Sequence, residues 1–519
     1  MDAFRTFLWY AAAMRMSTAR TAVWAGAIAL AIACPASGLP PAATSLGHVS
    51  IYRGPIHWQV LLCQFTDSAS LAQQNGISPQ PLHDPDYYTS LFFTPGTSGL
   101  QDYVRAVSYG AASVTGAVHG WYTEPYTFAQ AKARHRFDHL TDCIKAAAHP
   151  QARYGPQAPA YTPPPNDRIY VITSPGIDLV GYNDRGAVGQ DWGFHTNSNG
   201  TMRIQRGTAL PEIAHEFGHG IGLAHSFSDD FASRHGGAPG EYDNQWDLMS
   251  AADIFSDPTG AFGGGPPFLD AHHLDELGWL GISRVTNLGV GTPGSSTVTL
   301  AALTHPEAKG FLEARIFFDP KDRFHYYTVE YRVADSWDSG LSGGRLNYPN
   351  KMIFINEVAY WGGDHHNLYI GYLQRAQGTD PARGVGMPDQ SLTANGVTIA
   401  VQSLSTTVAT VTVTTTQRIT YSGQQDDEYG PHTCATGFVW RGADDLDYVC
   451  VSPATRAQTQ ADDAAAASHE QPGGSDACVS GYVWREAFPN DQVCVTPQTQ
   501  AQARLDNSQA LRRLMMPNS

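Results

Sequence analysis

Residues 215–225, HEFGHGIGLAH, place three histidines and one glutamate within eleven positions. His215 and His219 are four residues apart, so on a helix their imidazoles lie on one face and can bind the same metal ion. Glu216 directly follows the first histidine, and its carboxylate can reach a water molecule bound to that ion. The spacing therefore predicts a metal ion whose water molecule lies beside a carboxylate base.

Gly222 decides whether a third histidine can join the first two. His225 lies six residues past His219, and a straight helix would carry it away from the ion. A glycine accepts a backbone conformation that a residue with a Cβ atom resists. We therefore expect a positive φ at Gly222, where the chain turns and brings His225 back as the third ligand. Three protein ligands leave the fourth position open to water, which is the pattern of catalytic rather than structural zinc.

The full spacing, HExxHxxGxxH, resembles the zinc signature of the metzincin clan of metallopeptidases. That resemblance implies a methionine in a tight turn beneath the metal, and Met249, 24 residues after His225, is the candidate. No tyrosine closely follows Met249, so the metal-binding tyrosine of some metzincins is not expected. The chain is also similar, over about residues 55–415, to secreted peptidases related to gametolysin and immune inhibitor A. The stretches that carry this second resemblance are residues 60–68, 103–122, 265–280 and 326–341.

The resemblance implies a secreted zinc endopeptidase that acts on proteins or peptides. One catalytic Zn²⁺ would be held by His215, His219 and His225, and Glu216 would be the general base. A calcium ion is a further option that no residue pattern indicates. The alternative is a zinc-binding adhesion or cell-wall-binding protein with a vestigial peptidase centre. The retained Glu216 argues against it, because zinc binding alone needs no such carboxylate.

Other histidine clusters are not expected to bind the catalytic metal. His272 and His273 lie in AHHLDELGWL, which predicts the helix that closes the catalytic domain. Three histidines and a water molecule already complete the coordination of the ion. Asp364, His365 and His366 are adjacent in the chain without helical spacing, so we interpret them as a surface loop.

The elements around the motif predict an α/β (α+β) metzincin-like catalytic domain, followed by a β-sandwich domain and a small disulfide-closed repeat tail. Continuous apolar runs predict buried strands, and a helix from about residue 208 to 221 carries the first two histidines. This catalytic domain would span residues 49–285, with substrate across the lower edge of its sheet. Short alternating strands in residues 286–416 are typical of a β-sandwich.

Composition favours an exported protein. The chain has 519 residues, a net charge of −16 and no concentrated basic region, so nucleic acid is not an expected partner. Residues 1–38 read as a signal peptide region, with arginines before the apolar run 22–34. That run is short for a membrane span, so no stable span is expected in the mature chain. Cys34 leaves a lipid-anchored form as an alternative to secretion.

The tail, residues 430–519, contains two repeats at a period of 44, residues 434–463 and 478–507. Local pairing predicts the disulfides Cys434–Cys450 and Cys478–Cys494, and we expect the tail to fold apart from the peptidase. Trp440 and Trp484 hold equivalent places and are interpreted as core residues, although such aromatics could also contact cell-wall material or polysaccharide. Cys63 and Cys143 form either a third pair or two buried free thiols.

Overall fold

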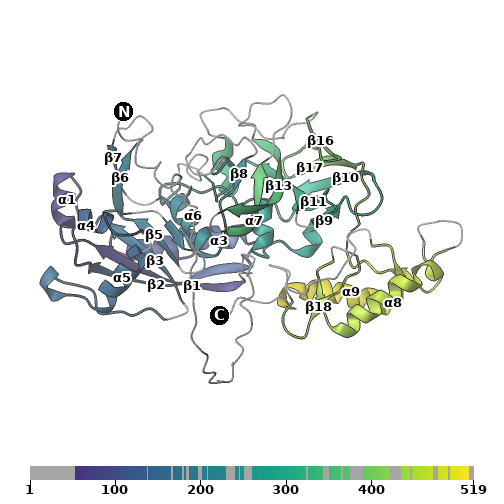
Figure 1. Cartoon of the computed structure of the whole chain (residues 1–519), viewed down its shortest axis with the longest axis horizontal. Coiled ribbons are helices and arrows are strands. Elements are labelled where there is room, and N and C mark those ends of the chain that lie inside the picture. Colours follow the sequence, from purple (N-terminus) through teal and green to yellow (C-terminus); the bar gives the residue numbers. More distant parts are fainter. Residues whose placement is uncertain are drawn as a thin grey trace, which may run out of the picture.

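The structure, a computed structural model, describes residues 53–513 apart from 137, 165–166, 178–179, 183–185, 197–201, 207–208, 229–239, 245, 251–259, 323–324, 343–349, 364–365, 374–389, 421–433, 445–446, 472–476 and 489–490. The described chain is a mixed α/β protein with several sheets. The helix that carries the histidine motif, α6, lies between the sheet of the N-terminal half and the sheets that follow it (Figure 1). The predicted signal region and Cys34 lie outside the described residues.

The N-terminal half is built on a five-stranded sheet with the order β2-β1-β3-β5-β4. Its strands are β1 (Gly54–Gln64), β2 (Ala112–Thr123), β3 (Arg168–Ser174), β4 (Val180–Tyr182) and β5 (Gly186–Gln190). All neighbouring pairs are parallel except β4 and β5, so β4 is an antiparallel edge strand. The apolar runs in β1 and β3 are buried on both faces, as parallel strands covered by helices require.

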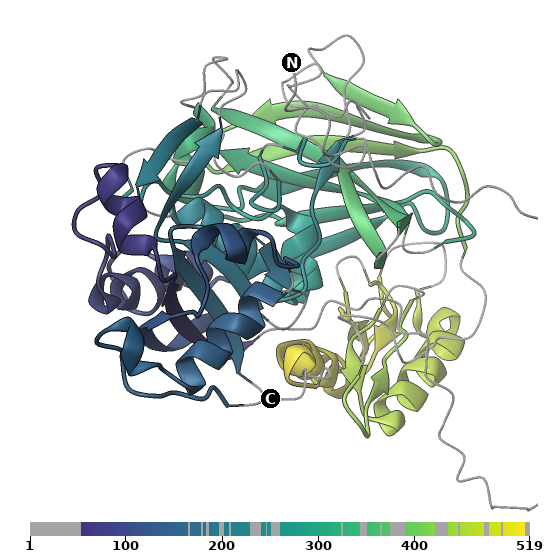
Figure 2. The same ribbon diagram turned by 60° about the vertical axis from the view of Figure 1, so that its left-hand side comes forward.

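Helices cover both faces of this sheet (Figure 2). Val60 and Leu62 of β1 pack in one core with α2 (Pro85–Phe92), α3 (Leu100–Val107) and α6 (Leu210–Gly220). Leu61 and Cys63 point to the opposite face and pack on α5 (Asp138–Ala148). Cys63 forms a disulfide with Cys143 of α5, so these two cysteines are a third pair and not two free thiols. The remaining helices of this half are α1 (Ser68–Gln74), α4 (Phe128–Lys132) and η1 (Ala152–Tyr154).

A hairpin of β6 (Trp192–Thr196) and β7 (Met202–Arg206) precedes α6. The helix expected at about residues 208–221, which carries the first two histidines of the motif, is observed as Leu210–Gly220. Downstream of the histidine motif, α7 (Ala271–Glu276) and η2 (Ile282–Arg284) lead into the second half of the chain.

The second half contains two further sheets that share one apolar core. The four-stranded sheet has the order β10 (Gly294–Ala301), β17 (Val408–Thr415), β16 (Val397–Leu404) and β15 (Ser391–Ala394). The six-stranded sheet has the order β8 (Phe227–Ser228), β14 (His366–Leu373), β13 (Lys351–Gly363), β12 (Tyr326–Val333), β11 (Glu313–Phe317) and β9 (Val285–Leu288). The 3-10 helix η3 (Ser336–Ser342) follows β12. His366 begins a strand, which corrects the surface loop expected there, and Asp364 and His365 lie outside the described residues.

The six-stranded sheet crosses the domain boundary expected at residues 285 and 286. Phe227 and Ser228, which closely follow the third histidine, pair in parallel with Tyr372 and Leu373 of β14. A two-residue strand is too short to show a periodicity, so the sequence could not predict this pairing. The segment that carries the histidine motif is therefore physically joined to the downstream sheet.

The tail contains both predicted disulfides, Cys434–Cys450 and Cys478–Cys494. Each repeat has one short antiparallel hairpin and one helix. The first consists of β18 (Val439–Trp440), β19 (Cys450–Val451) and α8 (Pro453–His469), and the second of β20 (Val483–Trp484), β21 (Cys494–Val495) and α9 (Pro497–Gln509), with η5 (Ala510–Arg513) at its end. Ser452 and Thr496 cap the two helices at equivalent positions, each followed by proline, which suits the first helical turn.

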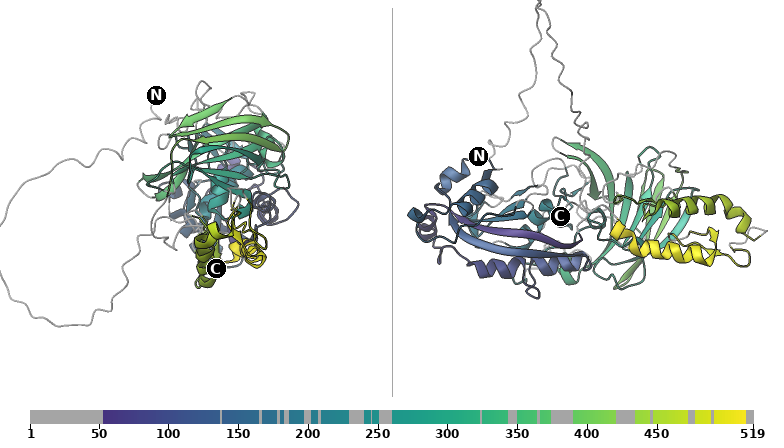
Figure 3. Two further views of the ribbon diagram at one scale, coloured as in Figure 1. Left: turned by 90° about the vertical axis from the view of Figure 1, so that its right-hand side faces the viewer. Right: turned by 90° about the horizontal axis from the view of Figure 1, so that it is seen from below.

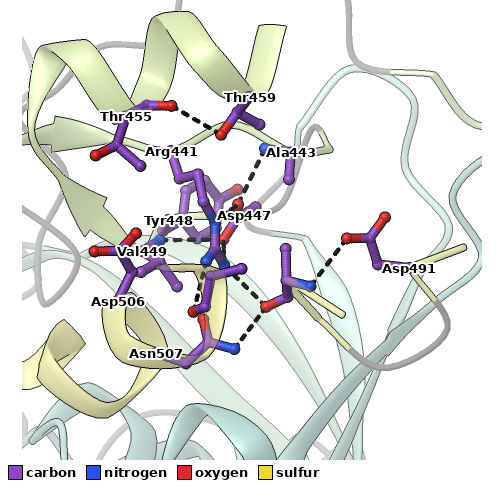
Figure 4. Close-up of polar contacts among 12 residues, drawn as sticks. Arg441, Ala443, Asp447, Tyr448, Val449, Thr455, Thr459, Asp491, Asp506 and Asn507 are labelled. Carbon is purple, nitrogen blue, oxygen red and sulfur yellow. Dashed lines mark hydrogen bonds and ion pairs between the residues drawn. The ribbon is translucent and has the colours of Figure 1, made fainter. Parts of the chain in front are cut away.

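Buried arginines tie the two repeats to each other, and Figure 4 shows the contacts of one of them, Arg441. Arg441 of the first repeat pairs with Asp447 at 2.7 Å and also donates to the carbonyl of Ala487 in the second repeat at 2.9 Å. Its counterpart Arg485 pairs with Asp491 at 2.8 Å and reaches back to Asp463 of α8 at 2.7 Å. Each guanidinium thus satisfies groups in both repeats, so the two units form one interlocked lobe.

The tail packs against the six-stranded sheet, a contact that the sequence did not predict. It forms a lobe at one end of the molecule (Figure 3), but Trp440 packs in a shared core with Phe317, Tyr326 and Val358 of the six-stranded sheet. Trp440 is 1% exposed, whereas Trp484 is 38% exposed. The interpretation of both tryptophans as core therefore holds for Trp440 and is wrong for Trp484, because only the first repeat faces the sheet.

No helix among the described residues combines the length and the apolar character that crossing a membrane would require.

Candidate metal centre

Three imidazoles converge at the end of α6. His215 and His219 lie on the helix, and His225 follows it, with ligand nitrogens of all three within 4.8 Å of one another. The ring centroids are 4.8 Å apart for His215 and His219 and 4.6 Å for His219 and His225. The structure thus brings together the three histidines that the sequence singled out.

Helix α6 forms because its inner face is apolar and its end is shaped by glycine. Ile213 and Phe217 are buried in the core beneath the sheet, which leaves His215 and His219 on another face of the helix. At the end of the helix, Leu223 N donates to Gly218 O at 3.0 Å and Gly222 N donates to His219 O at 2.9 Å. These two bonds form a Schellman motif, which requires a left-handed residue. Gly222 has the expected positive φ, 97°.

Each imidazole is oriented by an oxygen acceptor at its Nδ1 atom. The Nδ1 to oxygen distances are 2.8 Å from His215 to the Leu248 carbonyl, 2.8 Å from His219 to the Leu223 carbonyl and 2.6 Å from His225 to Glu241 Oε1. An imidazole whose Nδ1–H donates to oxygen keeps the lone pair of Nε2 available as a ligand. These acceptors therefore define which nitrogen of each histidine can bind metal.

The donor set fits Zn²⁺. His219 Nε2 and His225 Nε2 lie 2.9 Å apart. With both Nδ1 atoms protonated, the two Nε2 lone pairs repel each other, and a cation bound to both would relieve that repulsion. Burial, and then the neighbouring imidazoles of His225 and His215, lower the pKa of His219 well below its usual value. A neutral imidazole is the form that binds zinc. His215, His219 and His225 would hold the ion through Nε2.

Glu216, the residue that the sequence predicts as the base, is buried next to the first histidine of the motif. It follows His215 on α6 and is 8% exposed. Burial first, and then the charges of Glu241 and Glu216, raise the pKa of Tyr242. Glu216 is therefore within electrostatic range of Tyr242, whose ring lies 4.1 Å from the ring of His225.

Met249 lies beneath the helix that carries the histidines. It is fully buried, and a Cβ atom added to Gly218 would meet its Sδ at 2.4 Å. The turn around it is closed by a bond from Ser250 N to Asp247 O, and the preceding residue, Leu248, supplies the acceptor for His215. Met249 and Gly218 thus pack as the turn beneath a metal site requires.

Sequence reasoning missed two residues of the site, Glu241 and Tyr242. Both lie after the segment 229–239, which is outside the described residues, and they return to the histidines because residues 226–228 pair with 240–242. Tyr242 precedes Met249 rather than following it, so a search after the methionine could not find it. The only local signal is Gly240, whose φ of 81° marks the turn into this pairing.

His272 and His273 lie on α7 and are not members of the three-histidine group. His273 instead forms a buried group with Asp247 and Asp270, whose potential ligand atoms lie within 4.8 Å of one another. A third group, Cys63, Glu124 and Cys143, has both thiols in a disulfide and cannot bind metal through them.

A scan against protein-family models finds no match for this chain, and a search of curated proteins finds none either.

Proposed function

We propose that this chain is a secreted zinc-dependent endopeptidase with a metzincin-like catalytic domain followed by a β-sandwich domain. The observation that carries the proposal is the convergence of three imidazoles with oriented Nδ1 atoms, followed on the same helix by the buried Glu216. A structural zinc site is closed by four protein ligands, whereas three leave a position for water. The Met249 turn and the Schellman end of α6 support the metzincin-like interpretation.

The chain's own residues divide the work of hydrolysis. Zinc bound to the three imidazoles would polarise a water molecule and the scissile carbonyl. Glu216 accepts the proton of the attacking water and passes it to the nitrogen of the leaving amine. The carboxylate of Glu241 lies 2.6 Å from His225 Nδ1 and orients that imidazole. Its negative charge also makes Nε2 a stronger ligand for a positive ion.

Tyr242 is the candidate for a second donor to the oxyanion. Its ring lies 4.1 Å from the His225 ring, and burial raises the pKa of a phenol that is already protonated at neutral pH. A protonated phenol can donate a hydrogen bond to the negative charge that develops on the carbonyl oxygen.

The edge strand β4 supports a position for an extended peptide substrate. β4 is antiparallel to β5 and ends the five-stranded sheet on the side of α6. An edge strand offers unpaired backbone groups with which a substrate backbone can form a ladder. This mode of binding would hold a peptide above the histidines with little dependence on side chains.

Secretion is supported by the three disulfides, since such bonds persist in oxidising compartments. A role for the tail in contacting cell-wall polysaccharide is favoured by one observation, the 38% exposed indole of Trp484. Exposed aromatic rings offer a flat apolar face to sugar rings. Retention of the full chain on insoluble cell-wall polysaccharide, and its loss in Trp484→Ala, would test this contact.

Casein hydrolysis with and without a zinc chelator tests the proposed function. The purified chain should contain about one zinc ion, lose activity with the chelator and regain it on addition of Zn²⁺. A chain that holds zinc and leaves casein and a panel of unstructured peptides intact would favour the adhesion alternative. A chain that binds no zinc would refute both.

A further inference from the structure

A buried carboxylate, Asp247, connects the turn beneath the metal centre to two of the metal-binding histidines. Its Oδ2 accepts from Met249 N at 3.0 Å and from the hydroxyl of Ser226 at 2.8 Å. Its Oδ1 accepts from Asp270 N at 2.7 Å. The side chain is fully buried, so these three donors fix it in one position.

The contacts of Asp247 with Met249 N and with the Ser226 hydroxyl both lie next to groups that hold zinc ligands. Met249 N is adjacent to the Leu248 carbonyl, which accepts from His215 Nδ1. Ser226 directly follows His225, and its own N donates to Met249 O at 3.0 Å. A shift of Asp247 would therefore move the acceptor of one ligand and the backbone of another.

His273 compensates the charge of Asp247. Its Nδ1 lies 3.1 Å from Asp247 Oδ2 and 3.3 Å from Asp270 Oδ1, and all three side chains are buried. Burial by itself would lower the pKa of His273, but the charges of Asp270 and Asp247 raise it to about 10. The imidazole is therefore a cation at neutral pH, held between two carboxylates by α7.

The ion pair is anchored in the downstream sheet. Glu330 of β12 accepts from Ala271 N at the start of α7. Arg332 of the same strand pairs with Glu330 at 3.0 Å and with Asp338 at 2.6 Å, and it donates to the Trp246 carbonyl at 3.0 Å. Trp246 directly precedes Asp247, so β12 holds the same turn from the other side.

A metal ion is the competing explanation for Asp247, Asp270 and His273. Two observations favour the ion pair. Both oxygens of Asp247 already accept hydrogen bonds from the protein, and Arg332 brings a second cation to the same network. His273 thus supplies the cluster with a positive charge of its own beside the two carboxylates, while Arg332 is paired with Glu330 and Asp338.

We propose that Asp247 and His273 are positioning residues that set the metal affinity of the three-histidine centre. Through them the downstream sheet becomes part of the metal site's frame. This inference rests on the proposed zinc function and adds to it the reason why α7 and β12 are needed.

The test compares zinc affinity, by chelator competition at pH 7, among the full-length wild type, Asp247→Asn, His273→Gln and the double variant. Each single variant should bind zinc about 10- to 100-fold more weakly, the usual effect of losing a residue that orients a ligand. The double variant should lose less than the product of the two single losses, because neither charge is then left unpaired. His305→Gln is the matched control, since His305 also bridges two carboxylates, Glu307 and Asp335, but at the surface.

Unfolding of the metal-free proteins separates positioning from stability. A folded variant with lower stability and unchanged zinc affinity would overturn the proposal, and so would equal losses in the control. If the charge variants do not fold, Ser226→Ala decides, because it removes only one hydroxyl from Asp247 and should still weaken zinc several-fold. A wild type that holds a second metal ion, lost in His273→Gln, would show that the cluster is itself a metal site. A wild type that binds no zinc would overturn the proposed function as well.

Discussion

At Glu216 the proposed chemistry depends on one carboxylate that follows a ligand and is not itself a ligand. Glu216→Gln should keep about one zinc ion per chain and lower casein hydrolysis by at least about 10²-fold, the scale for losing a general base. Metal analysis and initial rates measure the two effects. Glu212→Gln, one turn earlier on α6, is the matched control and should retain most activity. Normal hydrolysis by Glu216→Gln would disprove the mechanism.

Tyr242 tests whether the site has a second group that acts on the oxyanion. Tyr242→Phe should retain zinc and KM while kcat falls by about 10²-fold, because the lost hydroxyl would act only in the transition state. Tyr122→Phe, which removes a hydroxyl bonded to the Pro159 carbonyl, serves as the control. An unchanged kcat in Tyr242→Phe would mean that the ring only packs on His225.

His273 should make the stability of the metal-free protein depend on pH. Its folded pKa of about 10 lies above the ordinary value of 6.5, so its contribution is complete below about pH 6.5 and is lost as the pH rises through 10. The stability advantage of the wild type over His273→Gln should therefore shrink across that range. Urea unfolding with a chelator present measures it, and an advantage that is constant from pH 6.5 to 10 would contradict a charged His273.

At the scale of the element, the end of α6 decides whether the third ligand reaches the metal. Gly222→Val should lose zinc as His225→Ala does, because a β-branched residue resists a φ of 97°. Gly294→Val is the control, since an added side chain meets open space there. Zinc content after gel filtration is the measurement. Equal zinc loss in His272→Ala and His225→Ala would mean that the ligands were misassigned.

At the scale of the whole molecule, the two repeats of the tail provide a matched pair of tryptophans. Trp440→Ala should destabilise the protein by about 3–5 kcal/mol, the usual cost of truncating a buried aromatic, because it empties the core shared with Phe317 and Tyr326. Trp484→Ala, at the equivalent exposed position, should change stability by about 0.5 kcal/mol or less. Denaturant unfolding compares them. Equal effects would mean that the tail does not pack on the sheet.

Removal of the tail should lower the stability of the rest of the chain. Deleting residues 421–519 would expose Phe317, Tyr326 and Val358, so the shortened chain should be less stable, although the three-histidine group lies outside the tail. Hydrolysis of a short soluble peptide at low temperature should persist in the folded fraction. Loss of zinc from a folded truncation would show that the tail supports the metal centre at a distance.

Features that depend on spacing along one element could be predicted from the sequence. Residues three and four apart meet on a helix, so the spacing of His215 and His219 is enough to predict that both can bind one metal ion. The glycine at position 222 predicted a left-handed turn because few other residues adopt one. The repeat period predicted two of the disulfides, since only local pairing keeps each bridge within its repeat.

Contacts between segments that are distant in the chain could be known only from the folded structure. Glu241 contacts His225 from 16 residues away, and Asp247 contacts His273 of α7. No periodicity in the sequence predicts either contact. The pairing of β8 with β14 and the burial of Trp440 but not Trp484 depend on which surfaces meet. Such contacts arise from the packing of complete elements, so local sequence specifies the parts of this site and the fold specifies the frame that holds them.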